Sequence, residues 1–453
     1  MRRVLLLLVL FMGCGIISCR EDILEQKPDK ALVVPQTLSD MQGLLDNGLF
    51  RTDLRGIAEI ASGDYYIESS DWTSLRYIVE KNAYAWEQDV YEGATAVGEW
   101  NNSYKQVFYA NVALEGLNKI TPESSTLSAW NNVKGTALFF RAYAFYNLTQ
   151  VFASPFRQGE DTNAPGIPLR LNSNLNEESV RAGLEETYRQ ILQDLHEASE
   201  LLSEIQKYRT RPSKAAAFAL MARVYLAIED YDQALHYANA CLQLHSMLLD
   251  FNELDAEAPY PVPLFNDETI LLRILSNYAS FRPPVGKIDT SLDTSYSDND
   301  LRKVIFFRKN EDGTMSFRGS YHQSSVPFSG LATDEVYLIR AECYARTGNV
   351  AAAMEDVNTL LEKRWKAGTF FPFSAQTAEE ALSFILKERR KELVLRGLRW
   401  SGLRRLNKDA RFSVTLTRKL NGETITLLPG DPRYVFPIPD YIIDMTGMQQ
   451  NPR

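Results

Sequence analysis

The fold is decided by the stretch Gly135-Thr136-Ala137-Leu138-Phe139-Phe140-Arg141-Ala142-Tyr143-Ala144-Phe145-Tyr146-Asn147-Leu148-Thr149-Gln150-Val151-Phe152. Five apolar side chains in it recur at spacings of three and four, and therefore share one helix face: Leu138, Ala142, Phe145, Leu148 and Phe152. A second apolar stripe lies beside the first: Phe139, Tyr143 and Tyr146. A helix that is apolar on two sides must be covered on two sides. We therefore predict an interior helix that ends before Pro155.

Two later segments share a spacing that indicates stacked helix pairs. Ala222-Arg223-Val224-Tyr225 precedes Ala234 by the same twelve-residue interval at which Ala341-Glu342-Cys343-Tyr344 precedes Ala353. Small residues at matched places let two backbones approach closely, which is typical of tetratricopeptide repeats. The interior helix resembles a third, degenerate copy, and chance recurrence is the alternative. We predict a mostly α fold built on a tetratricopeptide-like helix-pair scaffold.

The remaining patterns suggest one domain over residues 36–453. We expect its helical scaffold at about 36–60, 100–152, 185–245 and 331–406, and loop-rich regions at about 61–99, 250–330 and 407–453. Ser154 to Asn176 is a long loop without periodicity, and such loops are often functional. The mixed charge run Lys387 to Glu392 indicates a solvated helix face, on which opposite charges at helical spacing form ion pairs.

The N-terminus indicates export. Met1-Arg2-Arg3 precedes an apolar run, Val4 to Met12, that is too short to span a bilayer and is typical of a secretory signal. Ile16-Ile17-Ser18-Cys19 then resembles a bacterial lipobox, whereas an ordinary signal peptide is the alternative. We predict a signal peptide at 1–18, a lipid on Cys19 that inserts in the outer membrane, and a tether over 19–35.

Composition and charge limit the partners and cofactors that the protein is expected to have. Hydrophobic residues make up 45% of the 453-residue chain and charged residues 24%, as in soluble globular proteins. A net charge of -9 argues against nucleic acid as a partner. The four histidines show no metal-ligand spacing, so we expect no cofactor. The acidic stretch Asp289 to Asp300 lacks the glycine and final glutamate of a helix-loop-helix calcium site. We predict a solvated loop there, and a structural calcium site is the alternative. Cys241 and Cys343 lie among small apolar residues, which favours buried free thiols over a disulfide.

Motifs along the whole chain resemble those of the SusD/RagB family of outer-membrane nutrient-binding lipoproteins. Besides Cys19, the matching stretches are Leu24 to Pro28, Trp100 to Asn111, Arg141 to Leu148, Ile385 to Leu395, Tyr434 to Pro439 and Gln450 to Pro452. Two departures lie in the expected scaffold. Arg396 stands where the family commonly has glutamate, and an acidic residue is missing near Ser401-Gly402.

The resemblance implies a helical scaffold packed against a loop-rich, ligand-binding half. It also implies a partner, a SusC-like TonB-dependent outer-membrane transporter over which the lipoprotein acts as a lid at the cell surface. Acidic residues after Cys19 resemble the surface-export tag of Bacteroidetes lipoproteins. Family members bind glycans or peptides through variable loops, so the resemblance carries over no fixed ligand site.

Aromatic residues in loops suggest where a ligand binds. We expect one wall of a shallow site from Tyr65, Tyr66, Asp71, Trp72, Arg76 and Tyr77, and the other from Tyr296 and Tyr321. Flat rings among hydrogen-bonding side chains suit sugars, and this favours a glycan over a peptide. The alternative is that these rings only pin their loops.

No motif supports catalysis, so we expect a binding protein and not an enzyme. Gly-x-Ser-x-Gly is absent, and no histidine lies near a recognisable nucleophile. Paired carboxylates meet only in the fold, which leaves a glycosidase open. A helical-repeat adaptor without transport function is a further alternative, and it would need no aromatic loop cluster.

Overall fold

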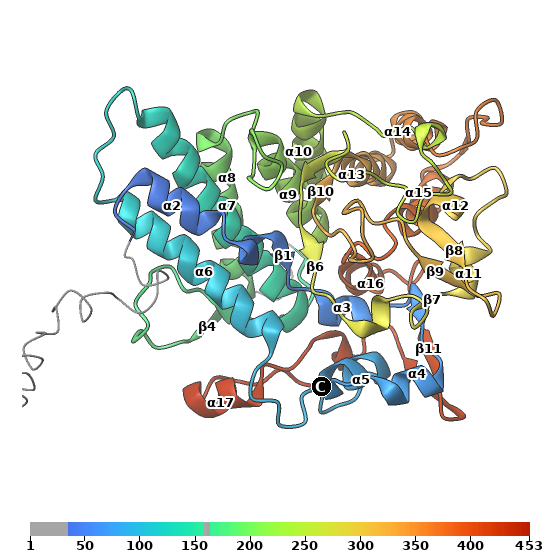
Figure 1. The fold of residues 1–453 in the computed structure, drawn as a ribbon, viewed down its shortest axis with the longest axis horizontal. Coiled ribbons are helices and arrows are strands. Elements are labelled where there is room, and N and C mark those ends of the chain that lie inside the picture. Colours follow the sequence, from blue (N-terminus) through green and yellow to red (C-terminus); the bar gives the residue numbers. More distant parts are fainter. Residues whose placement is uncertain (1–34, 158, 160–163) are drawn as a thin grey trace, which may run out of the picture. The chain divides into compact units, whose positions relative to one another are not determined.

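The computed structural model describes residues 35–157, 159 and 164–453, of which Thr37–Arg453 form one compact unit. The predicted signal peptide, Cys19 and nearly all of the tether lie outside the described residues. Long helices occupy one half of the unit, and short strands and loops occupy much of the other (Figure 1). The fold is therefore mostly helical, as predicted.

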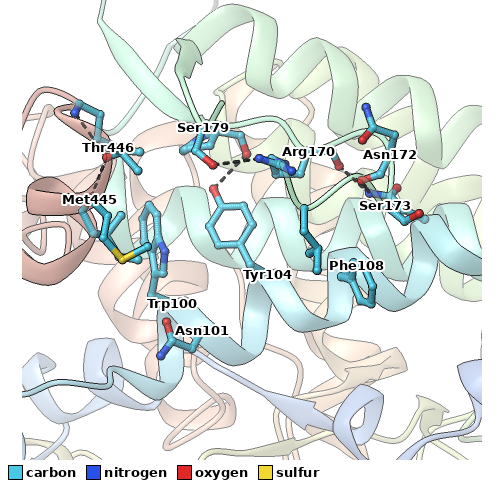
Figure 2. Close-up of a pocket in the computed structure, with 15 residues that line it drawn as sticks. Trp100, Asn101, Tyr104, Phe108, Arg170, Asn172, Ser173, Ser179, Met445 and Thr446 are labelled. Carbon is cyan, nitrogen blue, oxygen red and sulfur yellow. Dashed lines mark hydrogen bonds between the residues drawn. The ribbon is translucent and has the colours of Figure 1, made fainter. Parts of the chain in front are cut away.

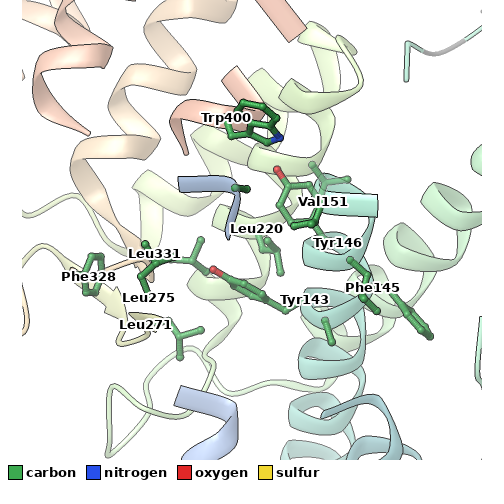
Figure 3. Packing of buried hydrophobic residues seen from close by; sticks show 14 of the residues in the cluster. Tyr143, Phe145, Tyr146, Val151, Leu220, Leu271, Leu275, Phe328, Leu331 and Trp400 are labelled. Atoms are coloured by element: carbon green, nitrogen blue, oxygen red, sulfur yellow. The ribbon is translucent and has the colours of Figure 1, made fainter. Parts of the chain in front are cut away.

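The interior helix is confirmed as α7 (Leu127–Phe152), which begins eight residues before the predicted start. Every residue from Gly135 to Phe152 is buried. Tyr143 lies among side chains from distant parts of the chain, including Leu220 and Leu331 (Figure 3). The helix ends because Ala153 turns to an extended conformation two residues before Pro155.

The repeat is confirmed as two helix pairs: α9 (Lys214–Ala227) with α10 (Tyr231–Leu244), and α13 (Thr333–Arg346) with α14 (Val350–Glu362). Asp230 and Asn349 hold equivalent positions and cap the second helix of each pair through a side-chain oxygen. Glu229 and Gly348 just before them both have positive φ, 63° and 85°. Glycine adopts that conformation without strain, whereas glutamate does not.

Other helices complete the scaffold around α7. They are α2 (Leu38–Leu45), α3 (Gly56–Ala61), α6 (Gly98–Leu117), α8 (Leu184–Leu201), α15 (Ala378–Glu392) and α16 (Arg399–Leu406). The segment expected to be loop-rich at 61–99 contains two short helices, α4 (Ser69–Ser74) and α5 (Ile78–Ala85). Further short helices are α11 (Thr290–Asp293), α12 (Arg302–Phe306) and α17 (Asp440–Thr446), and the 3-10 turns are η3 (Gly48–Arg51), η4 (Phe251–Glu253), η5 (Ala279–Phe281) and η6 (Pro432–Tyr434).

The described strands form only two-stranded sheets. β1 (Thr52–Asp53) pairs in parallel with β6 (Ile274–Leu275), and five pairs are antiparallel: β2 (Tyr65–Tyr66) with β7 (Lys287–Ile288), β3 (Pro165–Pro168) with β4 (Arg181–Gly183), β5 (Thr269–Leu271) with β10 (Leu331–Ala332), β8 (Phe307–Lys309) with β9 (Met315–Phe317), and β11 (Leu416–Leu420) with β12 (Glu423–Leu427). Three of the six pairs, β1–β6, β2–β7 and β5–β10, join segments far apart in sequence, and the other three are local.

The charge run on α15 is not a solvated face, which corrects that interpretation. Glu388, Lys391 and Glu392 are buried. Glu392 accepts hydrogen bonds from two buried guanidinium groups, Arg302 at 3.0 Å and Arg364 at 2.8 Å. Ion pairs inside the protein therefore bind α15 to the loop-rich half.

Candidate ligand-binding site

The first predicted wall lies mainly at the surface. Tyr66 on β2 and Asp71 on α4 are half-buried, whereas the Tyr77 side chain is 60% exposed. The guanidinium carbon of Arg76, also exposed, lies 5.8 Å from the centre of the Tyr77 ring. Trp72 is half-buried and donates a hydrogen bond from Nε1 to the Lys81 carbonyl at 3.1 Å. Trp72 therefore fastens α4 to α5 and presents only part of its ring.

Three predicted site residues are in the core, and for them the prediction was wrong. Tyr65 packs against neighbouring rings with 3% of its surface exposed. The Tyr296 hydroxyl donates to the Lys391 carbonyl at 2.7 Å, and the Tyr321 hydroxyl donates to Glu268 Oε2 at 2.6 Å. Burial raises the pKa of all three hydroxyls. Tyr65 reaches the Tyr66 cleft with only that small fraction of its surface. Tyr296 and Tyr321 pin their loops and form no second wall.

A polar cleft lies beside the first wall instead. We call it the Tyr66 cleft; it has a volume of about 550 Å³. Its opposite side is formed by the start of α11, by Arg390 of α15 and by the outer face of β11. Ser69 of α4 accepts a hydrogen bond from the Asn421 backbone at the tip of the β11–β12 hairpin, at 2.9 Å, so α4 forms the rim. Its buried rings Tyr84 and Trp86 are 1% and 2% exposed, so the cleft offers polar contacts and little aromatic surface.

A second concavity has an aromatic floor, and we call it the aromatic groove (Figure 2). Trp100, Tyr104 and Phe108 recur every four residues on α6 and face a cavity of about 410 Å³. The Trp100 and Tyr104 ring centres are 4.9 Å apart. The walls are the loop 168–179 and α17. Helical spacing has placed three rings in one row along a concave surface. Trp100 is only 5% exposed, and the half-buried Tyr104 and Phe108 present most of the aromatic surface.

Buried hydrogen bonds hold the loop wall against α6. The Asn111 side-chain amide donates to the Arg170 and Asn172 carbonyls, both at 2.9 Å. Its oxygen accepts from Arg141 Nη1 of α7 at 3.0 Å. Arg141 in turn forms a two-bond pair with Asp194 of α8, 2.7 Å for each bond. The interior helix thus positions the groove wall through one asparagine.

The loop is also fastened along its length. The Ser173 backbone donates to Glu115 Oε1 at 2.6 Å and the Ser173 hydroxyl donates to Glu115 Oε2 at 2.5 Å. Arg170 donates to the Glu177 carbonyl at 2.6 Å and to the Ser179 hydroxyl at 3.0 Å. A wall held in this way needs little ordering when a ligand binds.

The groove combines apolar edges with polar groups. Leu175 and Met445 form the edges, and each side chain is 78% exposed. The Asn101 and Asn172 side chains are exposed at the rim and carry both donors and acceptors. An aromatic floor with a few amides around it is the usual composition of a small-molecule site.

Two kinds of reactive site are a cysteine nucleophile and a metal centre, and the described residues bear on both. Both cysteines are free and buried, as predicted, and burial raises the pKa of Cys241 to about 12 and that of Cys343 still further. The nucleophilic form of cysteine is the thiolate, and burial with a raised pKa disfavours that form for both thiols. Within residues 35–157, 159 and 164–453 no three His, Cys, Asp or Glu side chains are grouped so as to hold a metal ion. Two acids of the suspected calcium loop have other roles: Asp289 caps α11, and Asp300 pairs with Arg302 at 2.7 Å.

Sequence reasoning missed the aromatic groove, although signals for it were present. Trp100 to Asn111 was interpreted as scaffold only, and the loop 154–176 was recognised as functional only in general terms. The four-residue spacing of Trp100, Tyr104 and Phe108 was the available signal. The α17 wall comes from more than 330 residues further along the chain, and no local pattern indicates it.

The fold is a helical scaffold of tetratricopeptide-like pairs, and it carries a groove with an aromatic floor. Residues 22–226 match a family model described as starch-binding and associating with the outer membrane, and residues 333–453 match the model of the SusD family. The chain belongs to the SusD family. Between 35 and 453, no described helix has the length and apolar character of a membrane span.

Known proteins agree with this assignment. The SusD-like protein P38 of Formosa agariphila is 21% identical over 98% of this chain and 97% of its own length. A SusD superfamily crystal structure from Bacteroides thetaiotaomicron has a TM-score of 0.73 at 20% identity, covering 92% of this chain and all of that one. A laminarin-binding SusD-like protein has a TM-score of 0.63 at 18% identity, covering 91% and 97%. At these identities the structural likeness shows the fold.

Proposed function

We propose that the protein captures a glycan at the cell surface and passes it to a SusC-like TonB-dependent outer-membrane transporter. The family description, starch-binding and associated with the outer membrane, supports this proposal, and so does the laminarin-binding relative. The observation that carries it is the aromatic groove, in which Trp100, Tyr104 and Phe108 line one concave surface.

The chemistry of the groove suits a carbohydrate. A sugar ring has a flat C–H face that an aromatic ring can cover, and its hydroxyls need both donors and acceptors. The groove supplies the rings along its floor and the amides of Asn101 and Asn172 at its rim. An extended peptide would instead pair with backbone groups along a free strand edge. In this groove the loop backbone near Asn172 already accepts hydrogen bonds from Asn111.

The surface around α4 remains a second proposed contact for the same ligand. It consists of Asp71, Trp72, Arg76 and Tyr77, on α4 and just after it, together with Tyr66, which lines the Tyr66 cleft. Tyr77 is its most exposed ring and adjoins a cationic side chain, so it offers a platform and a hydrogen-bond donor together. A peptide ligand is the second candidate, and peptide pools belong in the same binding screen.

Anchorage through Cys19 completes the proposal. A lipid there would hold the protein at the membrane and raise its effective concentration near a transporter, so that a modest interface suffices. The test is metabolic labelling with a fatty-acid analogue in the native host. Label on the wild type and none on Cys19→Ala supports the anchor, whereas equal label on both contradicts it.

A further inference from the structure

A small cavity between α15 and α16 is lined mainly by cationic groups. Its volume is about 40 Å³. Four arginines line it, Arg389 and Arg390 from α15 and Arg399 and Arg405 from α16, together with apolar leucines, Gly402 and a single carboxylate, Asp64. Water needs roughly 10–15 Å³ on this scale, so the cavity has room for an ion of one or a few atoms.

The carboxylates around this cavity are shared among several arginines. Asp64 Oδ1 lies 2.9 Å from Arg390 Nε and 3.4 Å from Arg399 Nε. Glu342 binds Arg405 at 2.6 and 3.0 Å, and also binds Arg346 at 2.9 Å. Arg390 also pairs with Asp289, at 3.1 Å, whereas Asp64 and Glu342 each face two arginines. Positive charge is therefore in excess on the Arg389 and Arg399 side of the cavity.

Among the described residues, two of the four lining arginines, Arg389 and Arg399, have no hydrogen-bonded acid. The ion-pair contact of Arg389 is Glu335, with Nη2 to Oε1 at 3.8 Å, and Glu335 is already bound by Arg223 at 2.8 and 2.5 Å. Within the described part of the chain, the buried Nη1 of Arg389 has no hydrogen-bond partner. Burial also lowers the pKa of this guanidinium, as expected when counter-charge is insufficient. An unpaired buried donor is costly, so a partner that binds there stabilises the fold.

Gly402 leaves the space in which a partner fits. It lies inside α16, where glycine is a poor helix former, and its amide makes an ordinary helical bond to the Leu398 carbonyl at 3.0 Å. A Cβ added at Gly402 would meet no atom within 4 Å. The helix therefore carries no side chain at Gly402, where one would find open space.

We propose that this cavity binds a small anion, a halide or a carboxylate group, between Arg389 and Arg399 beside Gly402. The anion supplies the negative charge that no side chain provides. Its source is either free in solution or the carboxylate of a sugar acid, since Arg390 and Arg399 also line the Tyr66 cleft.

The test compares urea unfolding of residues 20–453 at fixed ionic strength in methanesulfonate, chloride, formate or glucuronate salts. Methanesulfonate is the reference because it is neither a halide nor a carboxylate. At ten times its dissociation constant, a bound anion raises the folding equilibrium constant about elevenfold over methanesulfonate. Gly402→Asp should place a carboxylate in the cavity, stabilise the protein in methanesulfonate and remove the response. Gly402→Asn has the same shape without the charge and should keep the response.

Chloride-35 line broadening measures occupancy directly and does not depend on stability. The wild-type protein should broaden the chloride-35 resonance, whereas the Gly402→Asp and Arg389→Met variants should leave its width unchanged. A response to chloride or formate assigns a free anion, and a response to glucuronate alone assigns a sugar acid. Equal stability in all four salts without line broadening would overturn the proposal. A response of the same size in Gly402→Asp would also overturn it.

Discussion

Arg223 of α9 and Glu335 of α13 form a buried two-bond ion pair, with Nε to Oε1 at 2.8 Å and Nη2 to Oε2 at 2.5 Å. Both side chains are 2% exposed, and 112 residues separate them in sequence. Arg223 also donates to the Tyr143 hydroxyl of α7 at 2.9 Å. One guanidinium thus joins the two helix pairs to the interior helix.

Glu335→Gln should destabilise the protein strongly, because it leaves the Arg223 charge buried without its counter-ion. Removing one partner of such a pair costs about 3–5 kcal/mol of unfolding free energy. The matched control is Glu197→Gln in the exposed Lys134–Glu197 pair, which should cost less than about 1 kcal/mol. Urea unfolding measures both. Equal losses in the two variants would contradict the role given to Arg223.

Stability should depend on pH through Glu59 of α3. Burial, with the nearby Asp64 charge adding to it, raises the pKa of Glu59 from 4.5 to about 8. The unfolded chain then releases this proton at lower pH than the folded protein does. The Glu59 contribution to stability is therefore full below pH 4.5 and is lost as pH rises toward 8. Glu59→Gln imitates the protonated side chain, so its advantage over the wild type should grow from pH 5 to pH 8. Parallel stability profiles for the two proteins would exclude this titration.

Asn111→Leu should loosen the groove wall. The substitution leaves two loop carbonyls and one Arg141 donor without partners, at a cost of about 1–3 kcal/mol of unfolding free energy. The loop 168–179 should become sensitive to limited proteolysis, and ligand affinity should fall with it. Asn176→Ala, at an exposed position of the same loop, is the control and should change neither property. A protease-resistant loop in Asn111→Leu would show that Asn111 does not hold the wall.

Gentle detergent extraction from the native host should recover the protein together with a large TonB-dependent receptor in near-equal amounts. The anchor and the interface reinforce each other, so Cys19→Ala should lower the recovered receptor. Recovery of the wild-type lipoprotein alone would count against the transporter partner.

The parts of the fold that repeat locally were predictable from sequence. The α7 stripes and the twelve-residue interval are periodic signals within one or two helices. The burial of Tyr296 was not predictable, because its partner Lys391 comes from α15, 95 residues away. The prediction for the α15 charge run was wrong for the same reason. Arg302 and Arg364, which pair with the buried Glu392, belong to other segments of the chain. The walls of the aromatic groove likewise come from the loop 168–179 and from α17, and no local pattern in α6 indicates that they lie beside it.

Calorimetric titration of residues 20–453 with a panel of polysaccharides and peptide pools tests the central claim most directly. We expect a glycan to bind. Phe108→Ala should lower the affinity for that glycan at least about tenfold, equivalent to about 1.4 kcal/mol, while the protein stays folded. Phe371→Ala removes a ring that is 79% exposed on another part of the surface and should bind as the wild type does. Tyr77→Ala reports separately on the surface around α4. Unchanged affinity in Phe108→Ala, or binding of peptides only, would contradict glycan capture in the aromatic groove.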